Sequence, residues 1–331
     1  MLQSPRMSFR IFLAAAHFVL CLATALPLLA ADPHHEVVPD WPRLPKDHVL
    51  GLCAGVGVDS HNRVFVFHRS GRLWSNPFPK EPIAAPTVSV IDGSTGKLLD
   101  SWGANLFVMP HGLTVDHEGN LWLTDVGLHQ VFKFTPEGKL LLTLGERGKP
   151  GNDPARFNLP TDVAVLGDGS FYVSDGYQNT RVIKFTAEGR FEFQLGVKGS
   201  GPGEFNLPHG IAVDARQRVY VCDRTNSRIQ VFDAKGAFLD QWHGPHIGRP
   251  YGVDVSVNGS IFIIDGGEPS LKKSARGKAV ELDVSGRVLD TFGSAGKAPG
   301  QFQMGHAIAV GPDGAVYVAE GTGQRVQKFV Q

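Results

Sequence analysis

The stretch from His111 to Gly145, HGLTVDHEGNLWLTDVGLHQVFKFTPEGKLLLTLG, contains four short segments rich in apolar, aromatic and β-branched residues. Glycine-containing turns separate them, for example Glu118-Gly119 between the first two segments. Short apolar runs bounded by such turns predict β-strands joined by hairpins. The stretch therefore predicts one antiparallel sheet of four strands.

The same four-segment pattern recurs along the chain. An acidic residue ends the second segment in five copies, 42 to 55 residues apart, and a histidine takes its place in the first copy: His68, Asp125, Asp175, Asp223, Asp265 and Glu320. Repeats of about this length with four strands each are typical of β-propeller blades. Six units fit the chain, so we predict an all-β, six-bladed β-propeller.

The last unit lacks a fourth strand, because the chain stops at Gln331 soon after the third. The stretch Glu36 to Trp41 (EVVPDW) resembles that missing strand, with Trp41 placed as Trp102 and Trp242 are in other units. We predict that this N-terminal strand completes the last blade, because closing the ring removes its exposed edges. Residues 32–331 then form a single domain.

The overall composition excludes some classes of partner. Lys and Arg total 32 and Asp and Glu total 32, so the formal net charge is zero. A chain without excess positive charge has no field that attracts nucleic acid or an anionic membrane. Of three cysteines, only Cys53 and Cys222 lie after the N-terminal segment, too few for a disulfide framework.

Residues 1–31 have the layout of a secretory signal peptide. Arg6 and Arg10 precede an apolar run that extends to Leu29 and ends among small residues. We predict cleavage after a residue between 25 and 31, and hence a secreted or periplasmic protein without a membrane segment in its mature form. The alternative is a transmembrane anchor.

Three histidines occupy the start of the first strand in the second, fourth and sixth units: His111, His209 and His306. Alternate blades of a six-bladed ring are about 120° apart, so the three imidazoles converge on the central axis. Three histidines with a free fourth position are the ligand set of an open catalytic zinc site, which predicts bound Zn²⁺. The other units have residues at this position that cannot complete a closed site: Ala54, Thr161 and Tyr251.

The end of the second strand opens on the same face of the disc, because neighbouring strands are antiparallel. Arg69, Tyr177 and Arg224 follow that strand end in the first, third and fourth units. Two guanidinium groups beside a metal predict a substrate with a carboxylate, and Tyr177 is a candidate general base. The alternative for Arg224 is a salt bridge with Asp223 or with a neighbouring blade.

Two inserts interrupt the repeat, at Ser75 to Pro86 and at Gly266 to Lys278. Either they cover the metal site or they are solvated loops without a role. The chain contains no G-x-S-x-G motif of the kind that carries a serine nucleophile.

The phrases FNLP, YVxD and NxRIQVF resemble NHL repeats. Together with VFVFHR, PHGLTVD, SDGYQNTRV, LPHGIAVD, DRTNSRIQVF and MGHAIAV, they make the region from Val49 to Gln331 similar to the peptidyl-α-hydroxyglycine α-amidating lyase family. The resemblance implies that the three column histidines bind zinc. It also implies a catalytic role for Tyr177, an active-site role for Arg69 and Arg224, and a position near the site for Met304.

One position departs from that family. The family has Asp directly after the third histidine, where it binds a structural calcium ion together with carbonyls matching Val56 and Leu113. This chain has Ala307 there. Loss of the only charged ligand argues against calcium.

The resemblance implies a zinc-dependent lyase that converts an α-hydroxyglycine unit, on a peptide or a small molecule, into an amide and glyoxylate. The hydroxylated substrate is expected from a separate monooxygenase, unless the natural substrate is something smaller. Two alternatives remain from the residues alone: a secreted, lactonase-like zinc hydrolase, and an NHL scaffold that binds partners without catalysis.

Overall fold

The computed structural model describes Met1, residues 34–267 and residues 277–331. The predicted signal peptide therefore lies outside the described residues except for Met1, as does residues 268–276 of the second insert. The prediction of cleavage stays untested. No helix in the described part of the chain has the length and apolar composition needed to cross a membrane.

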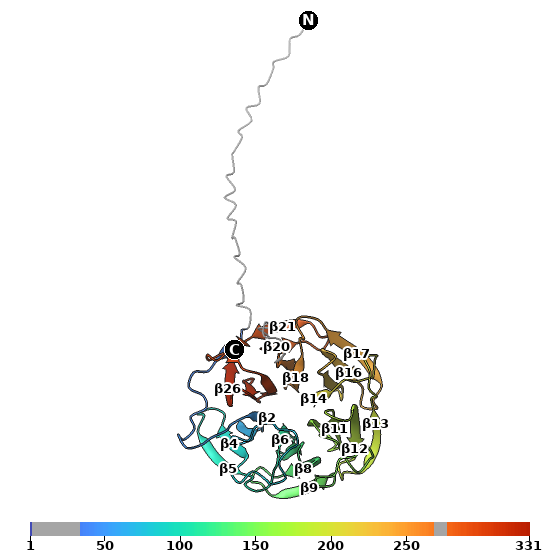
Figure 1. The fold of residues 1–331 in the computed structure, drawn as a ribbon. Coiled ribbons are helices and arrows are strands. Elements are labelled where there is room, and N and C mark those ends of the chain that lie inside the picture. Colours follow the sequence, from blue (N-terminus) through green and yellow to red (C-terminus); the bar gives the residue numbers. More distant parts are fainter. Residues whose placement is uncertain (2–33, 268–276) are drawn as a thin grey trace. The chain divides into compact units, whose positions relative to one another are not determined.

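The described residues form six four-stranded antiparallel sheets, which stand as blades around a ring (Figure 1). Residues Pro33 to Gln331 make up one compact unit. Blade 1 consists of β2 (Cys53–Val58), β3 (Arg63–His68), β4 (Val88–Asp92) and β5 (Leu98–Trp102). Blade 2 consists of β6 (Pro110–Val115), β7 (Leu121–Asp125), β8 (Gln130–Phe134) and β9 (Leu140–Leu144). Blade 3 consists of β10 (Asp162–Val165), β11 (Phe171–Asp175), β12 (Arg181–Phe185) and β13 (Phe191–Leu195).

Blade 4 consists of β14 (Pro208–Val213), β15 (Val219–Asp223), β16 (Arg228–Phe232) and β17 (Phe238–His243). Blade 5 consists of β18 (Pro250–Val255), β19 (Ile261–Asp265), β20 (Lys278–Leu282) and β21 (Val288–Phe292). Blade 6 consists of β24 (Gly305–Val310), β25 (Val316–Glu320), β26 (Arg325–Val330) and β1 (Glu36–Val37). A short parallel pair, β22 (Ser294–Ala295) and β23 (Gln301–Phe302), lies between the last two blades in sequence. The all-β six-bladed propeller is thus confirmed.

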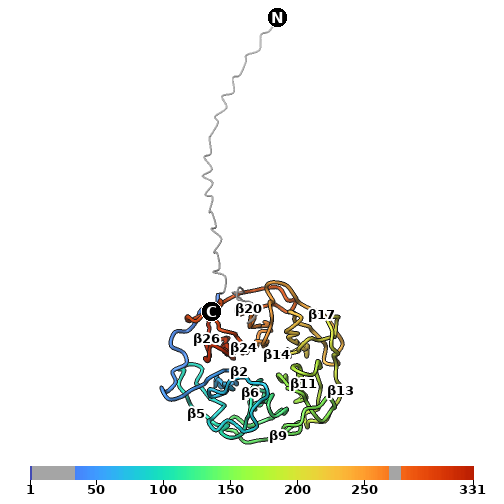
Figure 2. The backbone as a smooth tube through the Cα atoms, in the orientation of Figure 1, coloured from blue at the N-terminus to red at the C-terminus, as the bar shows by residue number. Residues whose placement is uncertain are grey.

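Within each blade the first strand faces the axis and the fourth lies at the rim, as β6 and β9 illustrate (Figure 2). Sequence pattern follows this placement. The second strands, such as LWLTD in β7, are buried throughout except for the half-buried Arg63 in β3, whereas the rim strand β9 exposes Leu140 and Leu141. Large side chains fill the space between blades; Trp122 of blade 2, for instance, lies with its ring 4.3 Å from that of Phe171 in blade 3.

The ring closes as predicted, through the N-terminal strand. β1 pairs antiparallel with β26, with Val37 opposite Phe329. The strand is only two residues long, shorter than the predicted stretch to Trp41. Trp41 still takes the predicted place, because it lies against Gly96 of the next blade as Trp102 lies against Gly138 and Trp242 against Gly286.

The acidic residues at the ends of the second strands hold the loops that lead into the innermost strands. The Asp125 carboxylate accepts hydrogen bonds from the backbone N–H groups of Val108 (2.7 Å) and Met109 (2.9 Å). Glu320 accepts one from Gln303 at 2.6 Å. These loops precede the column histidines by two or three residues, so the repeated carboxylates fix the start of each metal-facing strand.

Candidate metal centre

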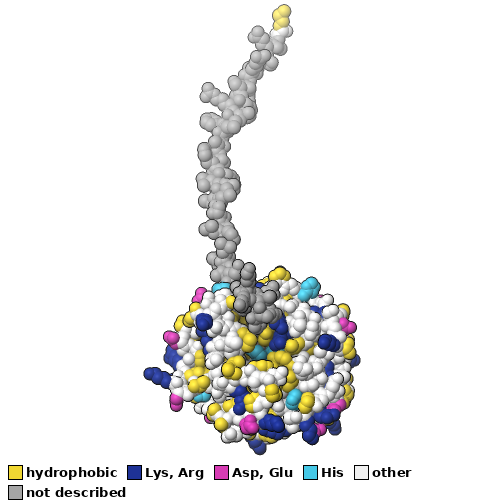
Figure 3. Space-filling view, viewed as in Figure 1, with side chains coloured by type: hydrophobic (Ala, Val, Ile, Leu, Met, Phe, Trp, Pro, Cys, Tyr) yellow, Lys and Arg dark blue, Asp and Glu magenta, His cyan; other side chains and the backbone are white. Residues whose placement is uncertain are grey.

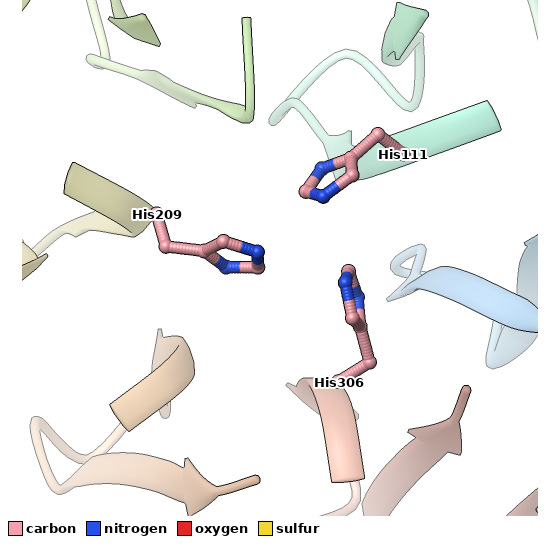
Figure 4. Close-up of side chains that lie close together, drawn as sticks. All are labelled: His111, His209 and His306. Carbon is pink, nitrogen blue, oxygen red and sulfur yellow. The ribbon is translucent and has the colours of Figure 1, made fainter. Parts of the chain in front are cut away.

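His111, His209 and His306 lie at the axis and point toward one another (Figure 4). Each is near the start of an innermost strand, β6, β14 or β24. Their ring centroids are 4.8, 4.8 and 4.9 Å apart, and one ligand atom from each lies within 4.8 Å of the others. The side chains expose 6% of their surface or less. The predicted convergence of the three imidazoles is confirmed, and the group is able to hold one metal ion.

The three blades without a histidine fix the orientation of the imidazoles. The Nδ1 atoms of His111, His209 and His306 lie 2.7, 2.6 and 2.7 Å from backbone carbonyl oxygens. Those oxygens belong to the same column in the intervening blades: Thr161, Tyr251 and Ala54. A carbonyl only accepts a hydrogen bond, so each Nδ1 carries the proton and each Nε2 keeps its lone pair for a metal.

Burial keeps the imidazoles neutral. It is the main reason why the pKa of His111 and of His209 lies well below the usual value of 6.5, and nearby positive groups lower it further. The pKa of His306 falls to about 3, again chiefly through burial. Neutral imidazole is the form that binds a transition metal, so the site needs no deprotonation to accept one.

Tyr177, in the loop after β11, reaches the histidines from blade 3. Its hydroxyl oxygen is 3.0 Å from Nε2 of His111 and 3.4 Å from Nε2 of His209. Arg224 donates to the same hydroxyl at 3.5 Å, and its guanidinium carbon lies 4.5 Å from the Tyr251 ring centroid. The structure thus places Tyr177 directly beside the candidate metal ligands, as predicted.

Arg69 and Arg224 are both at least nine-tenths buried. Among the residues that the structure describes, neither guanidinium forms an ion pair with a carboxylate, and Nε of Arg224 has no hydrogen-bond partner. The alternative pairing of Arg224 with Asp223 is wrong, because Asp223 binds Arg228 at 2.8 Å. Two buried cations without carboxylates are suited to an anionic ligand.

A cavity of about 470 Å³ opens beside His306, and Arg69, Tyr177, Arg224 and Met304 line it. Met304 is therefore near the site, as expected. In the space-filling view, histidine and hydrophobic side chains are visible near the middle of this face, while many charged side chains lie toward the edge (Figure 3). These four residues come from four different blades and are far apart in the sequence, but they lie around one cavity.

A second cavity, of about 280 Å³, extends from the histidines along the innermost strands, and Val56, Leu113 and Ala307 line it. Sequence reasoning missed two carboxylates there, Asp162 and Asp254. Burial raises their pKa values to about 8 and about 6. Backbone N–H groups bind both carboxylates, for example Val310 to Asp254 at 2.8 Å. Their position in the sequence, directly after Thr161 and three residues after Tyr251, is the signal that could have found them.

The first insert contacts the site. Trp74, just before it, has its ring centroid 5.3 Å from that of Tyr177, in a tilted arrangement, and 5.3 Å from the guanidinium carbon of Arg69. Phe78, within the insert, packs edge-on against Trp74 at 4.8 Å. Trp74 therefore lines the cavity, whereas the insert supports it from behind through Phe78 and does not itself line the cavity.

Comparison with known protein families agrees with this fold. A family model described as a 6-bladed beta-propeller matches residues 156–303, and one for the NHL repeat matches residues 107–134. Among solved structures, a gluconolactonase from Xanthomonas campestris superposes with a TM-score of 0.57 at 16% identity, covering 85% of this chain and 87% of that one. At that identity the likeness concerns the fold alone.

Curated relatives are more similar in sequence. Peptidyl-glycine alpha-amidating monooxygenase B of Xenopus laevis is 39% identical over 322 residues, covering 91% of this chain but 36% of its own length. Peptidyl-alpha-hydroxyglycine alpha-amidating lyase 2 of Drosophila melanogaster is 34% identical over 330 residues, covering 92% of this chain and 78% of its own. The chain thus spans about a third of the first relative and most of the second.

Proposed function

This chain belongs to the peptidyl-α-hydroxyglycine α-amidating lyase family, and on that premise we propose that it is a carbon–nitrogen lyase acting on an α-hydroxyglycine unit. The products are an amide and glyoxylate. One observation supports this most strongly: the Tyr177 hydroxyl lies beside the three clustered imidazoles, and two arginines that form no ion pair with a carboxylate of the described residues line the adjoining cavity.

We propose that His111, His209 and His306 hold a zinc ion. Their donor set fits this metal, because three neutral imidazoles with fixed Nδ1 protons suit zinc and leave a coordination position open. When bound, zinc supplies a Lewis acid that makes the substrate hydroxyl easier to deprotonate.

Arg69 and Arg224 bind the substrate carboxylate, which later leaves as part of glyoxylate. Both guanidiniums line the cavity. Their buried positive charge orients the substrate and holds its negative charge away from water.

Tyr177 moves the proton. Tyr177 acts as a phenolate: its oxygen accepts the proton of the α-hydroxyl group, and the electron pair of that O–H bond forms the carbonyl of glyoxylate. The carbon–nitrogen bond breaks, and the departing amide nitrogen takes up one proton, which Tyr177 returns. The 3.0 Å contact between the Tyr177 hydroxyl and Nε2 of His111 supports this role, because it puts the oxygen beside the proposed metal ligands.

The predicted location and supply of substrate are part of the same proposal. A secreted or periplasmic enzyme, released from its signal peptide, would receive α-hydroxyglycine compounds from a separate monooxygenase. The substrate is a peptide or small molecule that ends in a carboxylate.

Metal analysis of the purified protein, followed by an assay of glyoxylate release from an acetyl-dipeptide ending in α-hydroxyglycine, tests the proposal. Zinc together with glyoxylate is the expected result. Zinc without glyoxylate would favour the hydrolase alternative, and absence of zinc binding would leave only the scaffold alternative.

A further inference from the structure

The proposed reaction leaves one part of the substrate without an assigned contact, namely the group on the nitrogen side of the bond that breaks. The cavity of about 470 Å³ extends beyond the reacting groups. Arg69 and Arg224 are the only charged side chains among the described residues that line it, and the rest of its wall includes Leu52, Trp74 and Met304. The wall that remains for this group is therefore largely apolar.

The residue after the second strand explains why one side of the cavity is apolar. That position is arginine in blades 1 and 4, at Arg69 and Arg224, but glycine in blade 6, at Gly321. A Cβ atom on Gly321 would lie 2.1 Å from Cε of Met304. The glycine thus leaves its space to the Met304 side chain, whose flexible thioether adapts to apolar groups of different shape.

Trp74 also forms part of the wall. Its indole packs against Tyr177 and Arg69, yet 43% of its surface remains exposed. Phe78 supports it edge-on at 4.8 Å. A large ring that contacts two reacting residues and still exposes a face is placed to cover an apolar group of a bound substrate.

We propose that Leu52, Trp74, Tyr251 and Met304 form an apolar subsite for the side chain that precedes the α-hydroxyglycine unit. This inference rests on the proposed lyase function. The enzyme then favours substrates with a large apolar residue at that position. Burying a phenyl group rather than a methyl group predicts a gain of about 10- to 100-fold in kcat/KM.

The test compares acetyl-Phe-α-hydroxyglycine with acetyl-Ala-α-hydroxyglycine in the zinc-loaded, full-length mature protein. We expect kcat/KM to be at least about tenfold higher for the Phe substrate. Trp74→Ser should reduce this ratio to below about threefold, and Trp74→Leu should restore most of it. The ratio isolates the subsite, because damage to Arg69 or Tyr177 affects both substrates. Leu141→Ser, in the exposed rim strand β9, is the matched control and should leave the ratio unchanged.

Binding of the unreactive dipeptides acetyl-Phe-Gly and acetyl-Ala-Gly, measured by calorimetry, gives a readout without turnover. Equal affinities, or a Phe preference that survives in both Trp74→Ser and Met304→Ser, would overturn the subsite. If neither hydroxylated substrate releases glyoxylate, the lyase proposal fails. In that case, wild-type protein that binds acetyl-Phe-Gly more tightly than acetyl-Ala-Gly, with the difference lost in Trp74→Ser, would still support the subsite. Equal affinities of the wild-type protein for the two dipeptides would reject it.

Discussion

The even-numbered and odd-numbered blades contribute to the candidate metal centre in different ways. Blades 2, 4 and 6 supply imidazole side chains, whereas blades 1, 3 and 5 supply backbone carbonyl oxygens that bind the Nδ1 protons. A side chain is specified by sequence, but a carbonyl is present in every residue. This difference explains why the start of the innermost strand is histidine in every even-numbered blade (the even column). In the odd-numbered blades the same position (the odd column) is occupied by Ala54, Thr161 and Tyr251.

The largest effect is expected from removing an even-blade ligand. His209→Ala leaves two imidazoles, too few to retain zinc in an open site, so we expect loss of the metal and a fall in kcat/KM of about 10³-fold or more. Elemental analysis and glyoxylate release measure both. His243→Ala, an exposed histidine of the same blade, is the control. A His209→Ala variant that kept its full zinc content and activity would contradict the claim that the histidines of the even-numbered blades bind the metal.

Tyr177 is an odd-blade side chain that we assign to proton transfer rather than to metal binding. Tyr177→Phe should therefore keep one zinc per chain while kcat falls by about 10²- to 10⁴-fold. Measuring zinc content and turnover on the same sample separates the two roles. Unchanged turnover would show that another group accepts the proton.

The repeat period was enough to predict the ring, its closure by the N-terminal strand, and the meeting of His111, His209 and His306. This is because residues at the same place in the repeat lie at equivalent places around the ring. It was not enough to place Trp74, because Trp74 lies outside the repeated strand pattern, directly before the insert Ser75 to Pro86. The backbone carbonyls that bind the imidazoles could not be predicted either, because every residue has a carbonyl. Only the twist of the blades decides which carbonyl faces an imidazole. Asp162 and Asp254 were missed because they lie at different distances from the column residues Thr161 and Tyr251, so the repeat does not mark them as a pair.

Blade 6 differs from the other blades because a distant segment, β1, completes it. Beside β1, His35 binds Asp290 of blade 5 at 2.7 Å. Burial alone would raise the pKa of Asp290, but hydrogen bonds from His35 and from backbone N–H groups lower it overall. We expect Asp290→Asn to reduce the free energy of unfolding at pH 7 by about 1–3 kcal/mol.

The sign of this pH dependence follows from the lowered pKa. The Asp290 contribution is complete above the unfolded value of about 4 and disappears as the pH falls through the folded pKa. The difference in thermal stability between wild type and Asp290→Asn should therefore shrink between pH 5 and about pH 3. Asp100→Asn, at the same position of rim strand β5, is the matched control. An equal loss in both variants would remove the special role of ring closure.

The smallest effect is expected in the odd column. Thr161 contributes its carbonyl to His111, and its hydroxyl binds the Ser174 hydroxyl at 2.8 Å. Thr161→Ser retains both groups, so zinc content should be unchanged and kcat/KM should vary by less than about threefold, corresponding to under about 1 kcal/mol. Loss of zinc in this variant would mean that odd-blade side chains matter as much as even-blade ones.

X-ray absorption spectroscopy of the zinc-loaded protein tests the shared centre most directly. Three imidazole nitrogens at about 2.0–2.1 Å, with one further light ligand and no sulfur, is the result expected for an ion held by blades 2, 4 and 6. A spectrum with one imidazole or none, or with a sulfur ligand, would contradict it.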